Sequence, residues 1–130
     1  MAEGGKRIEL TEIGRVMARI PLDPRLARML IEARREGCLG EIAVIAAALS
    51  TQDPRERPVD KPAEADRAHA VFNDPASDFV TLLNLWRGYR QVREAGASRA
   101  ALKRFCRDRF LSYRRMREWE DIHRQIGEVL

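Results

Sequence analysis

Apolar side chains recur every three or four residues along most of this sequence, and this spacing restricts the fold more than any other feature. It places an apolar stripe along one side of a helix, whereas a half-buried strand needs strict alternation over four to eight residues, which no stretch shows. The chain has 130 residues, of which 45% are hydrophobic, and this is enough for one buried core. We therefore predict an all-α fold, a compact bundle of about seven helices.

Capping residues predict where several helices begin and end. Asp23 followed by Pro24 is typical of a helix start, and Gly37 is typical of a helix end. Thr11 is expected to cap an earlier, shorter helix that stops at Pro21. The later helices are expected to start at Asp60, Ser77, Ser98 and about Ser112.

The apolar stripes predict which side chains are buried. Residues 41–50 are apolar on every side, as in a helix surrounded by other helices. Residues 52–60 contain two prolines among charges and are expected to form a loop. The inward positions expected in the other helices are Ile13, Val16, Met17, Ile20, Leu26, Met29, Leu30, Ala33, Ala65, Ala68, Val71, Phe72, Phe79, Leu82, Leu83, Trp86, Leu102, Phe105, Cys106, Met116, Trp119, Ile122, Ile126 and Val129.

Positive charge is concentrated in one third of the chain. Residues 85–117 contain eleven basic and two acidic residues, while residues 1–84 sum to −2 and residues 118–130 to −3. Twenty-one of the 24 basic residues are arginine, a ratio that a GC-rich genome is enough to explain. Clustered guanidinium groups also suit polyanions, because their planar fork pairs two phosphate oxygens at once. From charge alone, a solvated helix surface and contact with nucleic acid are equally good explanations.

The last predicted helix carries its charges in the reverse of the order that a helix dipole favours. Arg114, Arg115 and Arg117 stand in its first turns, and acidic residues such as Glu118 and Asp121 follow. The arginines can pair with those acids three or four positions on. Alternatively, guanidinium groups beside the free amides of a helix start form an anion site, which is the interpretation we prefer.

No catalytic motif is present in the sequence. GxxxxGK[ST], GxSxG, HExxH and GxGxxG are all absent, so nothing predicts hydrolysis of ATP by this chain. Cys106 and His123 fall on different predicted helices, and a buried structural thiol is the better interpretation of Cys106. We expect neither an enzyme nor a bound cofactor.

Metal, disulfide and membrane functions also find no support in the residue pattern. The two cysteines are Cys38 and Cys106, and neither they nor the two histidines have the spacing of metal ligands. The longest apolar run, residues 42–49, is too short to cross a bilayer. Residues 1–6 have no apolar leader segment, so we expect a cytoplasmic location with no membrane partner.

Four ordered blocks of the sequence resemble one known family. LTEIGRVMARIPLDPRLARMLIEA (10–33) is similar to the helicase-associated region that follows the motor of DEAH-box RNA helicases. GCLGEIAVIAAALSTQDPRERP (37–58), SDFVTLLNLW (77–86) and CRDRFLSYRRMREWEDI (106–122) continue the pattern in the same order. The segment STQDPRERP resembles the corresponding segment of the bacterial HrpA-type branch. Where the eukaryotic branch begins the long helix with Gly-Asp-His, this chain has Ser77, Asp78 and Phe79, so no role of that histidine carries over.

The resemblance implies a division of the chain into parts. Residues 1–7 would be a flexible terminus or a cloning remnant, 8–22 the tail of a winged-helix domain, and 23–130 a ratchet-like helical domain. In such helicases the motor consists of two RecA-like domains that hydrolyse ATP with Mg²⁺, and an OB fold follows the ratchet. The chain would be a non-catalytic fragment whose partners are single-stranded RNA and the parent's own RecA-like, winged-helix and OB domains.

Two segments are the first candidates for RNA contact, because a translocating motor needs groups that hold the backbone without reading bases. In the FLSYRR turn, Ser112, Arg114 and Arg115 are expected to contact the backbone, with Tyr113 stacking. A Tyr113 ring packed under the preceding helix is equally consistent with the sequence. The QDPRERP loop would contribute Arg55 and Arg57, although Arg57 before Pro58 also fits contact with a neighbouring domain. The secondary candidates are Arg87, Arg90, Arg104 and Arg107.

Two functions follow from this interpretation. The first is an accessory module that holds single-stranded RNA and couples to the motor. The alternative is an interaction scaffold that packs on the motor and recruits a protein cofactor, with arginines meeting acidic protein surfaces and no RNA contact.

Overall fold

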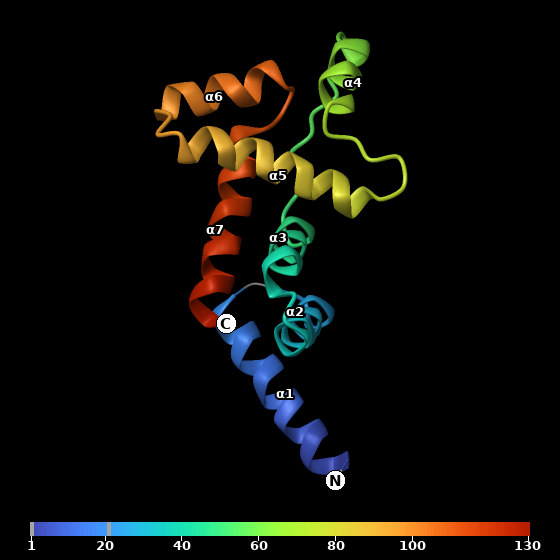
Figure 1. The fold of residues 1–130 in the computed structure, drawn as a ribbon, viewed down its shortest axis with the longest axis vertical. Helices are drawn as coiled ribbons and strands as arrows, with labels where there is room; N and C mark the ends of the chain where they lie inside the picture. The colour runs from blue at the N-terminus through green and yellow to red at the C-terminus, as the bar shows by residue number, and fades with distance from the viewer. Residues whose placement is uncertain (1, 21) are drawn as a thin grey trace. The chain divides into compact units, whose positions relative to one another are not determined.

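The computed structural model describes residues 2–20 and 22–130, with the side chains from Thr11 onward, and it is helical (Figure 1). This part of the chain contains no strand, which confirms the predicted all-α class. None of its helices is long and apolar enough to cross a bilayer. The seven helices are α1 (Ala2–Arg19), α2 (Pro24–Glu36), α3 (Leu39–Leu49), α4 (Pro62–Ala70), α5 (Asp78–Glu94), α6 (Arg99–Asp108) and α7 (Tyr113–Val129).

The helices divide into two compact units. Unit 1 consists of Met1–Thr51 with Trp119–Leu130, and unit 2 consists of Gln52–Glu118. The first unit therefore contains α1, α2, α3 and the second half of α7, while the second contains α4, α5, α6 and the first turns of α7. The predicted winged-helix tail over 8–22, the ratchet-like part over 23–130 and the flexibility of residues 1–7 stay predictions.

Unit 1 is built around α2 and α3, and α2 also packs against α1. The Asp23 carboxylate accepts hydrogen bonds from the amides of Arg25 at 2.7 Å and Leu26 at 3.1 Å. Gly37 ends α2 with a φ of 77°, a left-handed conformation that favours glycine. Both boundaries of α2 were predicted from local sequence. Six consecutive residues of α3, Ala43 to Ala48, are buried as predicted, whereas Leu49 at the end of the helix is 47% exposed.

Unit 2 contains α5 with α6 beside it (Figure 1). Tyr89 of α5 is fully buried, and its ring meets Phe105 of α6 edge-on at a centroid distance of 6.3 Å. Gly88 allows Phe72 to approach α5, because a Cβ at this position would lie only 2.9 Å from the Phe72 ring. The predicted caps of α5 and α6 are present, since Val80 N donates to Ser77 Oγ and Ala101 N donates to Ser98 Oγ. The predicted start at Asp60 is wrong, because α4 begins at Pro62 after Lys61, which makes no side-chain cap hydrogen bond.

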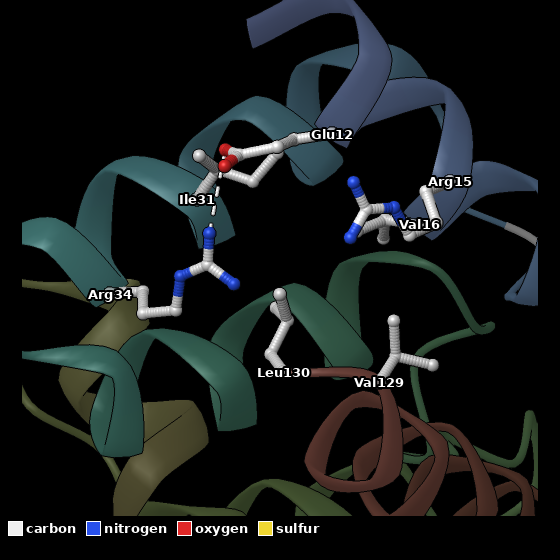
Figure 2. Close-up of a pocket in the computed structure, with 7 residues that line it drawn as sticks. All are labelled: Glu12, Arg15, Val16, Ile31, Arg34, Val129 and Leu130. Carbon is white, nitrogen blue, oxygen red and sulfur yellow. Dashed lines mark ion pairs between the residues drawn. The ribbon is translucent and has the colours of Figure 1, made fainter. Parts of the chain in front are cut away.

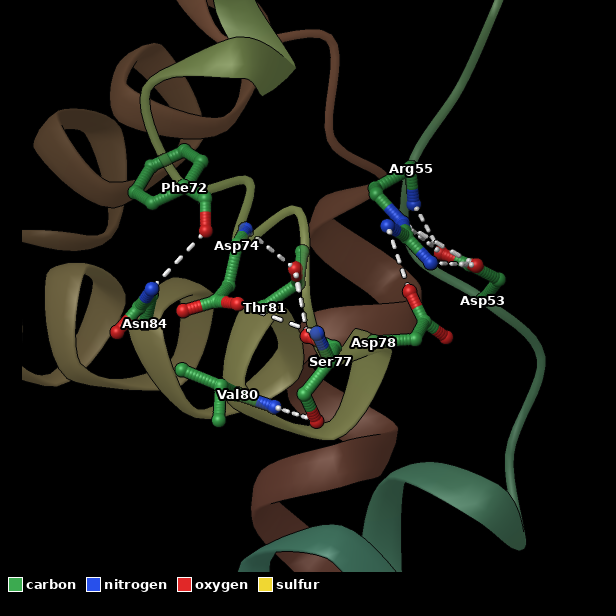
Figure 3. A network of polar contacts seen from close by, with 9 residues as sticks. All are labelled: Asp53, Arg55, Phe72, Asp74, Ser77, Asp78, Val80, Thr81 and Asn84. Carbon is green, nitrogen blue, oxygen red and sulfur yellow. Dashed lines mark hydrogen bonds and ion pairs between the residues drawn. The ribbon is translucent and has the colours of Figure 1, made fainter.

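A polar network orders the connection between α4 and α5 (Figure 3). Thr81 is 1% exposed, and its hydroxyl accepts a 2.8 Å hydrogen bond from Asp74 N and donates to Ser77 O. The Asn84 side-chain amide donates to Phe72 O at 3.0 Å. The start of α5, which carries Asp78 toward the loop before α4, is therefore held by its own side chains.

Some predicted boundaries and burial assignments are wrong. The first helix begins at Ala2 instead of Thr11, since nothing between these positions interrupts its backbone hydrogen bonding. Pro21, the predicted stop, lies outside the described residues, and α1 ends at Arg19. Val71 is 81% exposed because α4 ends one residue earlier, and Phe79 is 53% exposed in the first turn of α5. Met17 is 37% exposed, one position away from the buried stripe.

A candidate nucleic-acid interface

The two segments predicted to contact RNA lie against each other in unit 2. Glu56 N donates to Phe110 O at 2.8 Å, and Ser112 N donates to Pro54 O at 2.8 Å. These bonds form an isolated antiparallel bridge between Arg55 and Leu111. Residues 52–58 and the turn at 110–112 are thus fixed to each other, although about fifty-five positions separate them in the sequence.

The turn has an unusual backbone and a capped exit. Phe110 has a φ of 53°, the only positive φ at a non-glycine residue in the described part of the chain. Ser112 Oγ accepts a hydrogen bond from Arg115 N at 3.2 Å and so caps α7 where the sequence predicted. The Arg115 guanidinium donates to Asp53 O at 2.9 Å, which adds another bond between turn and loop.

Arg55 joins the loop to the start of α5 (Figure 3). Its guanidinium donates to the Asp53 carboxylate at 2.7 Å and lies 3.6 Å from the Asp78 carboxylate. Burial acts to raise the pKa of Asp53, but hydrogen bonds from the side chain and amide of Arg55, together with its charge, outweigh burial and lower that pKa. The hydrogen bond to Asp53, partly opposed by burial, raises the pKa of Arg55. Two carboxylates therefore pair with Arg55, a side chain that the sequence predicted to contact RNA.

Replacing Arg55 with alanine is expected to lower the free energy of unfolding near neutral pH by about 1 kcal/mol. The expected loss is that of an exposed ion pair, because the Asp53 side chain is 52% exposed. Because the pKa of folded Asp53 is depressed, its stabilising contribution is present above the unfolded pKa of about 3.9 and disappears as pH falls through the folded value. The difference between R55A and the unaltered chain should therefore shrink below about pH 4.

Urea unfolding followed by circular dichroism at a series of pH values measures this difference. Arg57→Ala is the matched control. Its guanidinium makes two hydrogen bonds to Asp66, at 2.9 and 3.1 Å, but both side chains are more than half exposed. R57A should leave stability unchanged within error. An R55A deficit that is equally large in acid would contradict the assignment.

A hollow of about 350 Å³ opens beside the bridge. Lys103 and Arg107 of α6 and Tyr113 of α7 contribute a cationic and aromatic lining, with Lys103 Nζ 5.7 Å from the centre of the Tyr113 ring. The remaining lining residues are Glu56, Pro58, Cys106, Phe110 and Leu111. Both basic side chains are on exposed residues, and within the described chain no carboxylate pairs with either of them. Two charges are thus available to an anion at an aromatic ring.

The other predicted residues are not gathered at this hollow. Arg114 is exposed and lies 3.5 Å from Glu118, which supports charge pairing along α7 at this position. Arg90 lies over the Trp86 ring at 5.7 Å and 3.5 Å from Glu94. Arg57 is exposed and pairs with Asp66, and the exposed residues Arg87 and Arg104 do not line the hollow. The predicted stacking role of Tyr113 and all predicted RNA contacts stay predictions.

Sequence reasoning missed three residues at this site. Lys103 stands within the basic segment, and its position one helical turn before Arg107 was the signal that could have found it. His69 contacts the turn through Phe110 O, and Asp53 binds Arg55 and Arg115. No local pattern identifies the contact of His69 with Phe110 or that of Asp53 with Arg115, because these partners are 41 and 62 positions apart, whereas Asp53 and Arg55 are only two positions apart.

Unit 1 has hollows of another character. A small one, about 90 Å³, is lined by residues of α1, α2 and the end of the chain, and in it Glu12 Oε2 lies 3.4 Å from the Arg34 guanidinium (Figure 2). A larger apolar one, about 460 Å³, lies at Met29, Ala33 and Ile42. Neither contains a residue predicted to bind RNA. No group of three metal-ligating side chains occurs in the described residues.

Comparison with known proteins decides the family. The model of the helicase-associated domain (HA2), ratchet-like, matches residues 23–120. The chain belongs to this family. The ratchet-like chain is 44% identical over 128 residues to the ATP-dependent RNA helicase HrpA of Escherichia coli, covering 98% of the chain and 10% of that protein. It is 48% identical over 123 residues to the HrpA homolog of Haemophilus influenzae, covering 95% of the chain and 9% of that protein.

A eukaryotic relative is also similar. The pre-mRNA-splicing factor ATP-dependent RNA helicase prp22 of Schizosaccharomyces pombe is 36% identical over 121 residues, which cover 93% of the chain and 10% of that protein. The ratchet-like chain thus spans about a tenth of the length of these relatives. The resemblance to the HrpA-type branch is confirmed by the higher identities to the two bacterial proteins.

Proposed function

We propose that this chain is a non-catalytic accessory domain of an ATP-dependent RNA helicase, which contacts the backbone of single-stranded RNA and couples it to the motor domains. The observation that carries the proposal is the hollow at Lys103, Arg107 and Tyr113, beside the bridge that joins the two candidate segments. The similarity to helicases of which the chain spans about a tenth supports an accessory role.

The chemistry of the hollow suits a nucleic-acid backbone. Two cations that pair with no carboxylate in the described part of the chain can neutralise phosphates, and the adjacent Tyr113 ring offers a surface on which any base can stack. Its side chains show no paired arrangement of amide groups for reading a base edge, and a motor that moves along RNA must accept every sequence. Hydrolysis of ATP with Mg²⁺ would belong to the RecA-like domains of the longer protein, which with its winged-helix and OB domains would be the intramolecular partners.

Lys103→Ala combined with Arg107→Ala is expected to weaken binding of the chain to single-stranded RNA about tenfold at low salt, because two phosphate contacts are lost. The slope of log affinity against log salt should fall by roughly 1.4, two contacts at about 0.7 each on a single strand. Fluorescence anisotropy of a labelled oligouridylate, titrated with the chain at several salt concentrations, measures both quantities.

Arg19→Ala combined with Arg25→Ala is the matched control. It removes the same charge from exposed positions of unit 1, so affinity should change little. An equal loss of RNA affinity in both double variants would show that binding depends on net charge and not on the hollow. The absence of any binding by the unaltered chain at low salt would contradict RNA contact.

The scaffold alternative makes a different prediction for the full-length helicase. A photoreactive RNA should form adducts within residues 50–60 or 110–117 if this domain contacts RNA. A scaffold that only recruits a protein would give none there. The apolar hollow of unit 1 at Met29 and Ile42 is the surface that such a scaffold would offer.

A further inference from the structure

His69 supports the candidate interface without lining it. The imidazole is half-buried on α4, and its Nε2 lies 3.0 Å from Phe110 O across 41 positions of sequence. A carbonyl oxygen only accepts hydrogen bonds, so Nε2–H is the donor. The neutral tautomer with a proton on Nε2 and the imidazolium both supply this donor, so the bond needs no change of charge.

The accepting carbonyl belongs to the one residue of the turn with an unfavourable backbone. Phe110 has a φ of 53°, a region that residues with a side chain adopt rarely unless surrounding contacts hold them there. Its carbonyl accepts from both His69 Nε2 and Glu56 N, at 3.0 and 2.8 Å. The two bonds come from different segments, and together they fix the direction of the peptide that follows Phe110.

That peptide leads directly into the interface. Leu111 is 3% exposed, Ser112 caps α7, and Tyr113 reaches the hollow as the first residue of the helix. A rotation at Phe110 would therefore displace the Ser112 amide from Pro54 O and re-aim Tyr113 relative to Lys103.

We infer that His69 is a positioning residue for RNA binding, because its Nε2–H holds the Phe110 carbonyl and so keeps the turn before α7 in its binding geometry. The inference rests on the proposed function, and it adds a group that does not itself line the hollow but bonds to Phe110, which does. The neighbouring carboxylates of Asp53 and Asp66 do not replace this role, because an ionised carboxylate has no proton to donate to the Phe110 carbonyl.

His69→Ala in the 130-residue chain tests the inference with two measurements. Hydrogen exchange followed by NMR should show faster exchange of the Glu56 and Ser112 amides, on the order of tenfold, since both bonds depend on the turn. Anisotropy with labelled oligouridylate should show affinity reduced about three- to tenfold. His69→Gln, whose amide nitrogen can occupy the position of Nε2, should restore both quantities toward the values of the unaltered chain.

Arg67→Ala is the control on the same helix, because Arg67 is exposed on α4, and it should change neither measurement. If H69A loses its helical circular dichroism signal, H69N takes its place, because its shorter amide does not reach Phe110 O. Unchanged amide exchange, or unchanged RNA affinity despite faster exchange, would overturn the inference. If the unaltered chain binds no RNA, the proposed function fails, and amide exchange still decides whether His69 holds the turn.

Discussion

Trp119→Ala is expected to lower the free energy of unfolding by about 3 to 5 kcal/mol, the range for removing a large aromatic side chain from a core. Trp119 is fully buried in unit 1, and it is the largest of the fully buried side chains in the described residues. Its indole Nε1–H donates a 2.9 Å hydrogen bond to Val44 O of α3. Truncation would leave a cavity between α3 and α7 and would also remove a buried hydrogen bond. The loss is a large fraction of the roughly 5 to 15 kcal/mol that stabilises a typical domain.

Trp119→Phe separates the two contributions. Phenylalanine keeps most of the apolar volume but has no donor for Val44 O, so it should cost less than half as much as alanine. Urea unfolding followed by the helical circular dichroism signal measures both variants. A W119A chain within about 1 kcal/mol of the unaltered one would mean that unit 1 does not depend on this contact.

Tyr89→Ala is expected to have the second large effect and to lower the free energy of unfolding by about 3 kcal/mol or more. Tyr89 is 0% exposed in unit 2, and its edge-on contact with Phe105 joins α5 to α6. Because α6 carries Lys103 and Arg107, RNA binding should weaken along with stability, although Tyr89 does not line the hollow.

Tyr89→Phe keeps the ring and its contact with Phe105, so it should retain most of the stability and the RNA affinity. Urea unfolding and RNA anisotropy on the same preparations distinguish the two variants. Wild-type affinity in a folded but strongly destabilised Y89A chain would show that the α5–α6 contact does not position the basic lining.

Local sequence patterns were sufficient to predict most of the helices. Asp23, Pro24 and Gly37 act through hydrogen bonds and backbone preferences within a few residues, so the bounds of α2 could be read directly. The serine caps at 77, 98 and 112 are present for the same reason. The start of α1 was wrong because Thr11 can also stand inside a helix, and its capping ability alone does not create a boundary.

Long-range contacts were needed to define the site. The sequence predicted both segments, but some contacts of their arginines depend on acids and carbonyls brought near by folding. Arg55 meets Asp78, and Arg115 meets Asp53 O at a separation of 62 positions. The same folding left Lys103 and Arg107 at a hollow where no carboxylate of the described side chains pairs with either of them.

Helix type and most helix ends followed from the order of the residues, because their causes act over one or two turns of backbone. Packing decided which cations face an open hollow. It also decided which histidine holds the turn beside that hollow. These contacts join α4, the loop after α3, α6 and the start of α7, and their geometry depends on the whole of unit 2.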